Sequence, residues 1–202
     1  MQKPIIAVDI DDVLAQSTDA LRLTVNERLG INLQPQHYQI PGDYWGYYEY
    51  VWAEQGIEDR ISIDDIHELM KSHQLHVQPT PGAAIALKKL TNDYELIVIT
   101  ARDSNWQDVT MEWLSQHFPG IFSRVVFAAG HQGLNNKSKG EICIEEAAAW
   151  LIDDNVQHAQ TAFENGVQVI LFGDYGWHQN VPDMMLRCKD WQEVVDYFEA
   201  RD

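Results

Sequence analysis

Short apolar runs alternate with helical patterns along most of this chain, and this alternation constrains the fold more than any other feature. The runs contain many Val and Ile residues and occupy 4–8, 95–99, 124–127, 150–152 and 167–172. Runs of this length that are continuously apolar are typical of strands buried on both faces. Helical patterns follow or separate them, at 82–90, 106–118, 140–149, 156–165 and 191–198. The sequence therefore predicts a parallel α/β sheet flanked by helices.

One long interval, residues 17–76, interrupts this alternation. It has helical periodicity near both ends but no pattern of a buried strand, and an aromatic stretch occupies its middle, 44–52. We predict an α/β core built from residues 1–16 and 77–202. Residues 17–76 are predicted to form a small helical insert that lies over the sheet.

The charge and the cysteine content exclude several classes of function. Acidic residues outnumber basic ones 31 to 14, and the net charge of −17 would repel a nucleic acid polymer or an anionic membrane. No apolar run approaches the roughly 20 residues that span a bilayer. The two cysteines lack metal-pair spacing and the N-terminus lacks an export signal, so we expect a cytoplasmic protein. The sequence does not fix the oligomeric state, and a homodimer is compatible with it.

Asp9 and Asp11 stand where the first predicted strand ends. Ligands bind at the carboxyl ends of strands in open α/β sheets. Clustered carboxylates raise each other's pKa values, which favours a bound cation, and Mg²⁺ is the ion that prefers oxygen ligands of this kind. An acidic turn that merely ends a strand and caps a helix is the competing interpretation of this run alone.

Further polar residues follow two other predicted strands, and a lysine opens a helix between them. These residues are Thr100, Lys139, Asp153 and Asp154. A site that combines a metal, a nucleophilic carboxylate, a hydroxyl group and a lysine suits phosphoryl transfer. The sequence therefore favours a phosphoryl-transfer site at this edge of the sheet.

The order Asp-x-Asp, Thr, Lys and Asp-Asp, spread over nearly the whole chain, resembles the haloacid dehalogenase (HAD) superfamily of phosphohydrolases. The insert that follows the first motif resembles a C1-type cap. The segments 77–83 and 151–154 are similar to those of the 5′(3′)-deoxyribonucleotidases and their bacterial homologues. The resemblance implies a HAD-like Rossmannoid sheet with a cap after its first strand.

The resemblance also implies roles for the acidic residues. Asp9 would attack phosphorus and become an aspartyl phosphate, and Asp11 would protonate the leaving alcohol and later activate water. Mg²⁺ would be held by the Asp9 carboxylate, the Asp11 backbone carbonyl and Asp153. Asp154 would be a further ligand or would orient the others.

Thr100, Ala101 and Lys139 would contact the phosphoryl oxygens by the same resemblance. Lys137 is a second candidate for the lysine, but Lys139 is favoured because it directly precedes a predicted helix. The deoxyribonucleotidases have a serine where this chain has Ala101, and a glycine where it has Asp12. The missing hydroxyl group weakens the expectation of nucleotide specificity.

We expect a small phosphorylated metabolite as substrate, with a nucleoside monophosphate as the first to try. Tyr44, Trp45 and Tyr48 are speculative contacts for a planar leaving group, although most rings of the aromatic stretch are expected to pack as core. Arg102 is expected either to grip a second anionic group or to be a surface residue that pairs with an acid. His131 is more plausible as a solvated loop residue than as part of the site.

Two alternatives remain open. A phosphatase for a non-nucleotide metabolite, such as a sugar phosphate, is favoured by the alanine at position 101. A non-enzyme alternative is a receiver-like or non-catalytic phosphoryl-binding protein. A receiver domain carries its acidic pair before the phosphorylated aspartate, whereas Asp153-Asp154 comes last in this chain, and the long insert has no place in that small fold.

Overall fold

A six-stranded sheet, parallel throughout, runs through the computed structural model, which describes residues 3–128 and 137–201. The strand order is β3-β2-β1-β4-β5-β6. The strands are β1 (Ile5–Val8), β2 (Glu95–Thr100), β3 (Val125–Phe127), β4 (Ala148–Asp153), β5 (Gln168–Phe172) and β6 (Leu186–Cys188). The predicted α/β fold class is confirmed, and the first strand lies in the middle of the sheet.

Helices cover both faces of the sheet because successive side chains of a strand point to opposite faces. Ile6 and Val8 belong to one apolar cluster, whereas Ile5 and Ala7 belong to another. The helices that contribute to the first cluster are α4 (Ala83–Leu90), α5 (Gln107–His117) and α8 (Trp191–Glu199). Those that contribute to the second are α6 (Lys139–Glu145) and α7 (Val156–Glu164).

The structure corrects the prediction at two places. The helix predicted at 140–149 ends at Glu145, because the following turn holds Ala147 in the left-handed region with a φ of 54°. Ala148 then pairs with Ile5, so it belongs to β4. Strand β6 was not predicted, because it is a three-residue edge strand that carries a charged residue at its centre.

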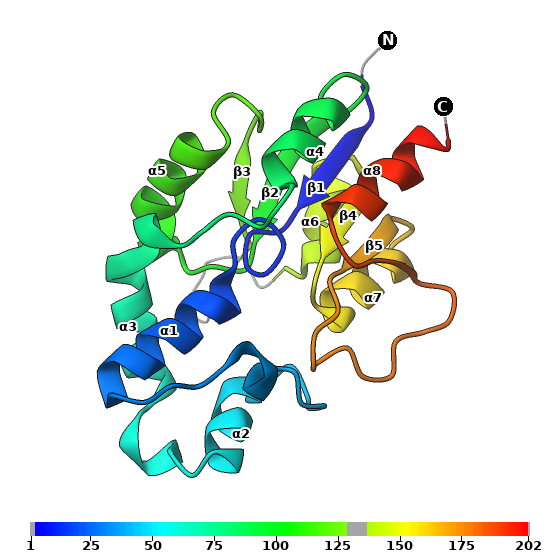
Figure 1. Ribbon diagram of the computed structural model, residues 1–202. Coiled ribbons are helices and arrows are strands. Elements are labelled where there is room, and N and C mark those ends of the chain that lie inside the picture. Colours follow the sequence, from blue (N-terminus) through cyan, green and yellow to red (C-terminus); the bar gives the residue numbers. More distant parts are fainter. Residues whose placement is uncertain (1–2, 129–136, 202) are drawn as a thin grey trace.

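Residues 17–76 are helical and contain no strand, and all of them are described. They form α1 (Ser17–Leu29), α2 (Tyr47–Glu54) and α3 (Ile63–His73), with short 3₁₀ turns at Pro35–Tyr38, Glu58–Arg60 and Gln74–His76. Buried residues such as Leu21, Val51 and Ile66 give this insert an apolar cluster of its own. Figure 1 shows the insert (blue to cyan) beside the carboxyl ends of the strands, away from the two termini.

The chain enters and leaves the insert at neighbouring points. The Gln16 backbone N–H donates to the Gln78 carbonyl at 3.0 Å, and the Thr80 N–H donates to the Leu14 carbonyl at 2.7 Å. These hydrogen bonds hold the two crossing segments side by side at the end of β1.

Two further observations concern the cysteines and the character of the helices. Cys143 and Cys188 are both buried and are not joined in a disulfide. Within residues 3–128 and 137–201, none of the helices combines the length and the apolar character needed to cross a membrane.

Candidate active site

Three carboxylates meet where β1 and β4 end. Asp9 directly follows β1, Asp153 ends β4 and Asp154 comes next. The Asp9 N–H donates to the Ile152 carbonyl at 3.0 Å, so the pairing of the two strands sets Asp9 beside Asp153. One carboxylate oxygen from each aspartate lies within 4.8 Å of the others, and all three residues are buried. We call Asp9, Asp153 and Asp154 the acidic cluster.

Lys139 is the buried cation of this cluster. Its Nζ atom lies 2.8 Å from Asp9 Oδ2 and 2.8 Å from Asp153 Oδ2. A capping box fixes the start of α6, because Ser138 Oγ accepts from the Glu141 N–H while Glu141 Oε2 accepts from the Ser138 N–H. Lys137, in contrast, is exposed and pairs with a glutamate of α6. The structure therefore brings Lys139, rather than Lys137, to the aspartates.

Close packing of α6 on α7 keeps Lys139 buried beside the aspartates. A Cβ atom at Gly140 would lie 2.7 Å from the Thr161 carbonyl oxygen of α7. Asn155 begins α7, since its side chain accepts from two backbone N–H groups of the first turn. The Asn155 N–H also donates to Asp153 Oδ1 at 2.9 Å. The start of α7 thus helps to orient one member of the cluster.

The charges in the cluster do not balance. Burial, opposed by Lys139, raises the pKa of Asp9 to about 6. Burial and then the Asp153 charge raise the pKa of Asp154 well above its usual range. Burial also acts to raise the pKa of Asp153, but the Lys139 ammonium holds it below its ordinary value. One lysine therefore neutralises only part of the carboxylate charge.

A hard divalent cation fits this donor set. Asp9 Oδ1 is buried and has no hydrogen-bond partner, although the other oxygen of the same carboxylate contacts Lys139. Carboxylate oxygens are the ligands that Mg²⁺ uses in phosphoryl-transfer sites. The unpartnered oxygen and the excess of negative charge are what such an ion would satisfy.

Asp11 points away from the acidic cluster and towards Arg102. The Arg102 Nε and Nη2 atoms donate to the two Asp11 oxygens at 3.0 and 2.6 Å, and Ser17 Oγ donates to Asp11 Oδ1. Burial acts to raise the pKa of Asp11, but the Arg102 guanidinium outweighs it and holds that pKa below its ordinary value. Asp11 is therefore ionised in this arrangement.

Arg102 itself is buried rather than exposed. Its Nη1 atom donates to Thr110 Oγ1 at 3.2 Å, and the Gln74 side-chain amide lies 3.2 Å from both terminal nitrogens. Of its two expected roles, the structure shows the pairing with an acid, but Arg102 is buried rather than at the surface, whereas the Asp11 side chain is 40 % exposed.

Asp12 adopts a left-handed backbone with a φ of 55°. A glycine would fit the same backbone, and aspartate is one of the few other residues that visit this region. Its carboxylate accepts from the Thr18 N–H at 2.9 Å and from Thr18 Oγ1 at 2.7 Å, at the start of α1. Burial raises the pKa of Asp12 to about 7. Tyr48 of α2 reaches the same network, with its hydroxyl group 2.9 Å from Thr18 Oγ1.

Thr100 is the last residue of β2, and it is fully buried. The pairing of Val98 with Val8 places Thr100 at the sheet edge that also carries Asp9. Its Oγ1 atom accepts from the Arg102 N–H at 3.2 Å. Ala101 is exposed at the same edge.

The rings of the aromatic stretch differ in burial, and α2 begins only at Tyr47. Tyr47 and Trp52 are buried, whereas Tyr44 and Tyr48 are half-buried and Trp45 is 63 % exposed. Burial and the Asp154 charge raise the pKa of Tyr44, and its ring lies edge-on to that of Trp177, with centroids 5.9 Å apart. Trp45 donates its indole N–H to Gln157 Oε1 at 2.7 Å and so connects the insert to α7. His131 lies outside the described residues.

Several contacts to these aspartates have only a weak signal in the sequence. Ser17, Thr18 and Asn155 are ordinary helix-start residues, and their positions just after Asp-rich segments are the only indication. Trp177 donates its indole N–H to Asp154. Its position in a Gly-rich turn after the last core strand indicates a place at the rim of the site, but not this contact.

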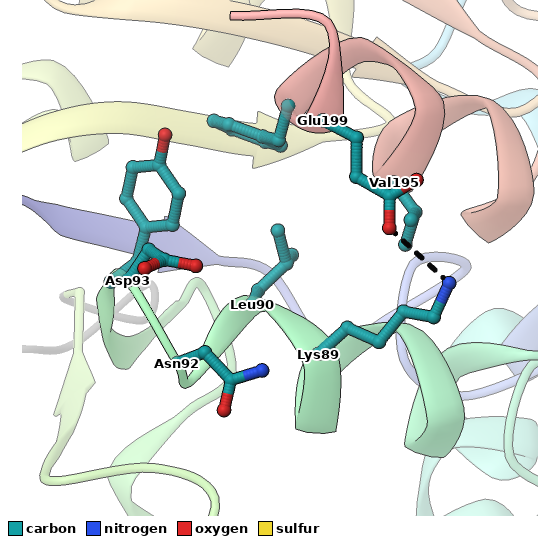
Figure 2. Close-up of a pocket in the computed structure, with 8 residues that line it drawn as sticks. Lys89, Leu90, Asn92, Asp93, Val195 and Glu199 are labelled. Atoms are coloured by element: carbon teal, nitrogen blue, oxygen red, sulfur yellow. Dashed lines mark hydrogen bonds and ion pairs between the residues drawn. The ribbon is translucent and has the colours of Figure 1, made fainter. Parts of the chain in front are cut away.

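A hollow elsewhere in the protein offers different chemistry. It has a volume of about 360 Å³ and lies between the end of α4 and α8, where Lys89 and Glu199 approach each other (Figure 2). Both of these side chains are more than half exposed. A buried acidic cluster is not among its lining residues, so we place the candidate active site at the carboxyl ends of β1 and β4.

Comparisons with known proteins match nearly the whole chain to one family. Residues 3–202 match the family described as 5′ nucleotidase, deoxy (pyrimidine), cytosolic type C protein. A Staphylococcus epidermidis protein that carries the provisional name 5′(3′)-deoxyribonucleotidase is 22 % identical over 210 residues, covering 99 % of this chain and 98 % of the relative.

Two solved structures share the fold. One, from Haemophilus somnus, is described as a predicted phosphoglycolate phosphatase; it has a TM-score of 0.66 and 16 % identity, and the match covers 100 % of this chain and 99 % of that one. The other is a provisionally assigned HAD hydrolase from Bacillus subtilis bound to magnesium. It has a TM-score of 0.65 and 12 % identity, over 98 % of this chain and 100 % of that one.

Proposed function

This chain belongs to the 5′ nucleotidase, deoxy (pyrimidine), cytosolic type C family, and from this membership we propose that it is a Mg²⁺-dependent phosphatase of nucleoside monophosphates. Membership makes the chain a phosphatase of the HAD type, so the receiver-like and non-catalytic alternatives are set aside. We further propose a cytoplasmic location, supported by the family description and by the two unpaired cysteines.

The proposed metal ligands are Asp9, Asp153 and Asp154, together with the Asp11 backbone carbonyl. Two observations support this set: the three carboxylates converge, and Asp9 Oδ1 is buried without a partner. The Bacillus subtilis hydrolase with the same fold holds magnesium. When bound, Mg²⁺ would supply positive charge that offsets the repulsion between an anionic nucleophile and an anionic phosphate.

Asp9 is the proposed nucleophile. Its carboxylate would form a bond to phosphorus while the bond to the leaving alcohol breaks, which gives an aspartyl phosphate. Lys139 would stabilise the charge on the transferring oxygens, since its ammonium already lies 2.8 Å from Asp9. Thr100 and the backbone at Ala101 would hold further phosphoryl oxygens at the end of β2.

Asp11 is the proposed acid and base. It would donate a proton to the leaving oxygen and later remove one from the water that attacks the aspartyl phosphate. In this structure its carboxylate is ionised by the Arg102 pair. The acid role therefore requires Asp11 to take up a proton and to exchange Arg102 for the leaving oxygen.

We propose that residues 17–76 form the cap that selects the leaving group. The half-buried rings of Tyr44 and Tyr48 lie near the aspartates, and Trp45 spans from the insert to α7. Aromatic rings such as these offer a planar base a large contact area.

The observation that carries this proposal is the buried contact of Lys139 with both Asp9 and Asp153 at the end of β1. Its test is phosphate release from a panel of nucleoside monophosphates and sugar phosphates, with Mg²⁺ or with EDTA. We expect deoxynucleotide turnover that needs Mg²⁺ and that disappears in Asp9→Asn. Turnover of sugar phosphates alone would show that the substrate is not a nucleotide, which is the alternative that the exposed Ala101 favours. Release that persists in Asp9→Asn would refute the nucleophile.

A further inference from the structure

The segment that follows β5, residues 173–178, folds back against the insert and the aspartates. Gly173 has a φ of 87°, and a Cβ atom there would lie 2.1 Å from the Tyr175 ring. A Cβ atom at Gly176 would lie 2.1 Å from the Tyr47 hydroxyl oxygen. The Gly42 N–H of the insert donates to the Gly176 carbonyl at 3.1 Å. Gly176 thus permits an approach to the insert that a larger residue would block, and Gly173 leaves room for the Tyr175 ring.

His178 Nε2 of this segment lies 2.7 Å from the Asp154 carbonyl oxygen, but the contact with the Asp154 carboxylate comes from Trp177. Its side chain is buried, and its indole N–H lies 3.1 Å from Asp154 Oδ2 and 3.2 Å from the Asp154 carbonyl oxygen. An indole N–H can only donate. The contact therefore fixes the direction of one of the Asp154 carboxylate oxygens.

The rest of the indole ring is held by packing. The ring stacks on Tyr175, with centroids 4.5 Å apart and planes at 8°. It meets Tyr47 and Tyr44 of the insert edge-on, at 5.1 and 5.9 Å. The Tyr175 hydroxyl group donates in turn to the Asp12 carbonyl. Because rings surround the indole on several sides, its N–H has a fixed direction towards Asp154.

We propose that Trp177 is a positioning residue for the cation, because it orients the Asp154 carboxylate within the acidic cluster. This inference rests on the proposed function only in that the cluster binds Mg²⁺. Hydrogen bonds to metal-binding carboxylates typically change metal affinity by about 10- to 100-fold. The indole N–H of Trp177 is such a hydrogen bond, supplied by a loop that also touches the insert.

The test compares Trp177→Phe with Trp113→Phe. Both replacements keep an aromatic ring and remove an indole N–H that donates to a buried acceptor, which is the Val77 carbonyl at 2.8 Å for Trp113. Trp113 lies in the apolar cluster between α5 and the sheet. Its indole N–H donates to Val77 and not to an aspartate. Circular dichroism during thermal unfolding would establish that each variant is folded.

Mg²⁺ binding is then measured by calorimetry without substrate. We expect Trp177→Phe to weaken Mg²⁺ binding by about tenfold or more, and Trp113→Phe to leave it within about twofold of the wild type. Equal affinities in all three proteins, or equal losses in both variants, would overturn the positioning role. So would a wild type that binds no Mg²⁺.

Failure of the proposed function gives a different result. A wild-type protein that binds Mg²⁺ in the calorimeter but releases no phosphate from the panel would contradict the phosphatase proposal, while the comparison of the two tryptophan variants would still decide the role of Trp177.

Discussion

Replacing Lys139 with methionine removes the buried cation but keeps a side chain of similar length. The lysine side chain is 1 % exposed, and its Nζ atom contacts Asp9 and Asp153 at 2.8 Å each. Burial by itself would lower the pKa of Lys139, yet the charges of Asp153 and Asp9 raise that pKa above its ordinary value. The lysine is therefore charged at neutral pH, and its loss leaves two buried carboxylates facing each other.

The expected loss of stability follows from this burial. Removing one partner of a buried ion pair costs about 3–5 kcal/mol, because the remaining charge is left without compensation. Lys137→Met is the matched control, since Lys137 makes only an exposed ion pair with Glu145. Exposed pairs contribute about 0–1 kcal/mol. The two variants should therefore differ by at least about 2 kcal/mol in the free energy of unfolding.

Urea unfolding in the absence of metal, near neutral pH, measures this difference. Under conditions where both variants are folded, phosphate release should fall by about 100- to 1,000-fold in Lys139→Met and remain near the wild type in Lys137→Met. A loss below about 1 kcal/mol for Lys139→Met, or equal losses for both variants, would show that the aspartates do not depend on this lysine.

The remaining predictions concern pH and packing. Because burial raises the pKa of Asp9 from 3.8 to about 6, the folded protein keeps a proton that the unfolded chain has released between these values. Without metal, Asp9 should therefore contribute about 1.4 kcal/mol more stability at about pH 5 than at about pH 8. Burial lowers the pKa values of His117 and His178, and these two groups make the protein more stable as the pH rises. The effect of Asp9 is therefore isolated by comparing the wild type with Asp9→Asn. Saturating Mg²⁺ should remove the difference in pH dependence between these two proteins. An identical pH dependence in the two metal-free proteins would contradict the raised pKa. Separately, Gly140→Ala should lower the free energy of unfolding in urea by about 1–3 kcal/mol. The reason is that its Cβ atom would lie 2.7 Å from the Thr161 carbonyl oxygen. An unchanged free energy of unfolding would mean that α6 and α7 can move apart without cost.

The order of the main elements could be predicted because buried parallel strands are continuously apolar. The same reasoning failed for β6, whose central residue is Arg187 on an edge strand. It also failed at Ala148, because alanine favours a helix by propensity whereas here it pairs with Ile5 in the sheet. Both errors arose where tertiary contacts, rather than local preference, decide the structure.

The placement of Asp9, Thr100 and Asp153 at one edge of the sheet could be expected because parallel strands end there, and the approach of Lys139 because it begins a helix at the same edge. The directions of the side chains could not be predicted in this way. The turn of Asp11 towards Arg102, across 91 positions in sequence, depends on how the end of β2 and the start of α1 meet. The contact of Trp177 with Asp154 likewise depends on the path of a loop that has no periodic pattern.

The two adjacent crossings at the base of the insert have a consequence for how such a protein can diversify. The backbone bonds from Gln16 to Gln78 and from Thr80 to Leu14 place the departure and return points of the chain beside each other. Residues 17–76 therefore form a loop whose two ends are fixed next to each other at the sheet. The entropic cost of closing such a loop grows only slowly with its length. Insertions, deletions or replacement of that loop leave the strand register intact. Selection can thus remodel the proposed cap while the acidic cluster stays in place.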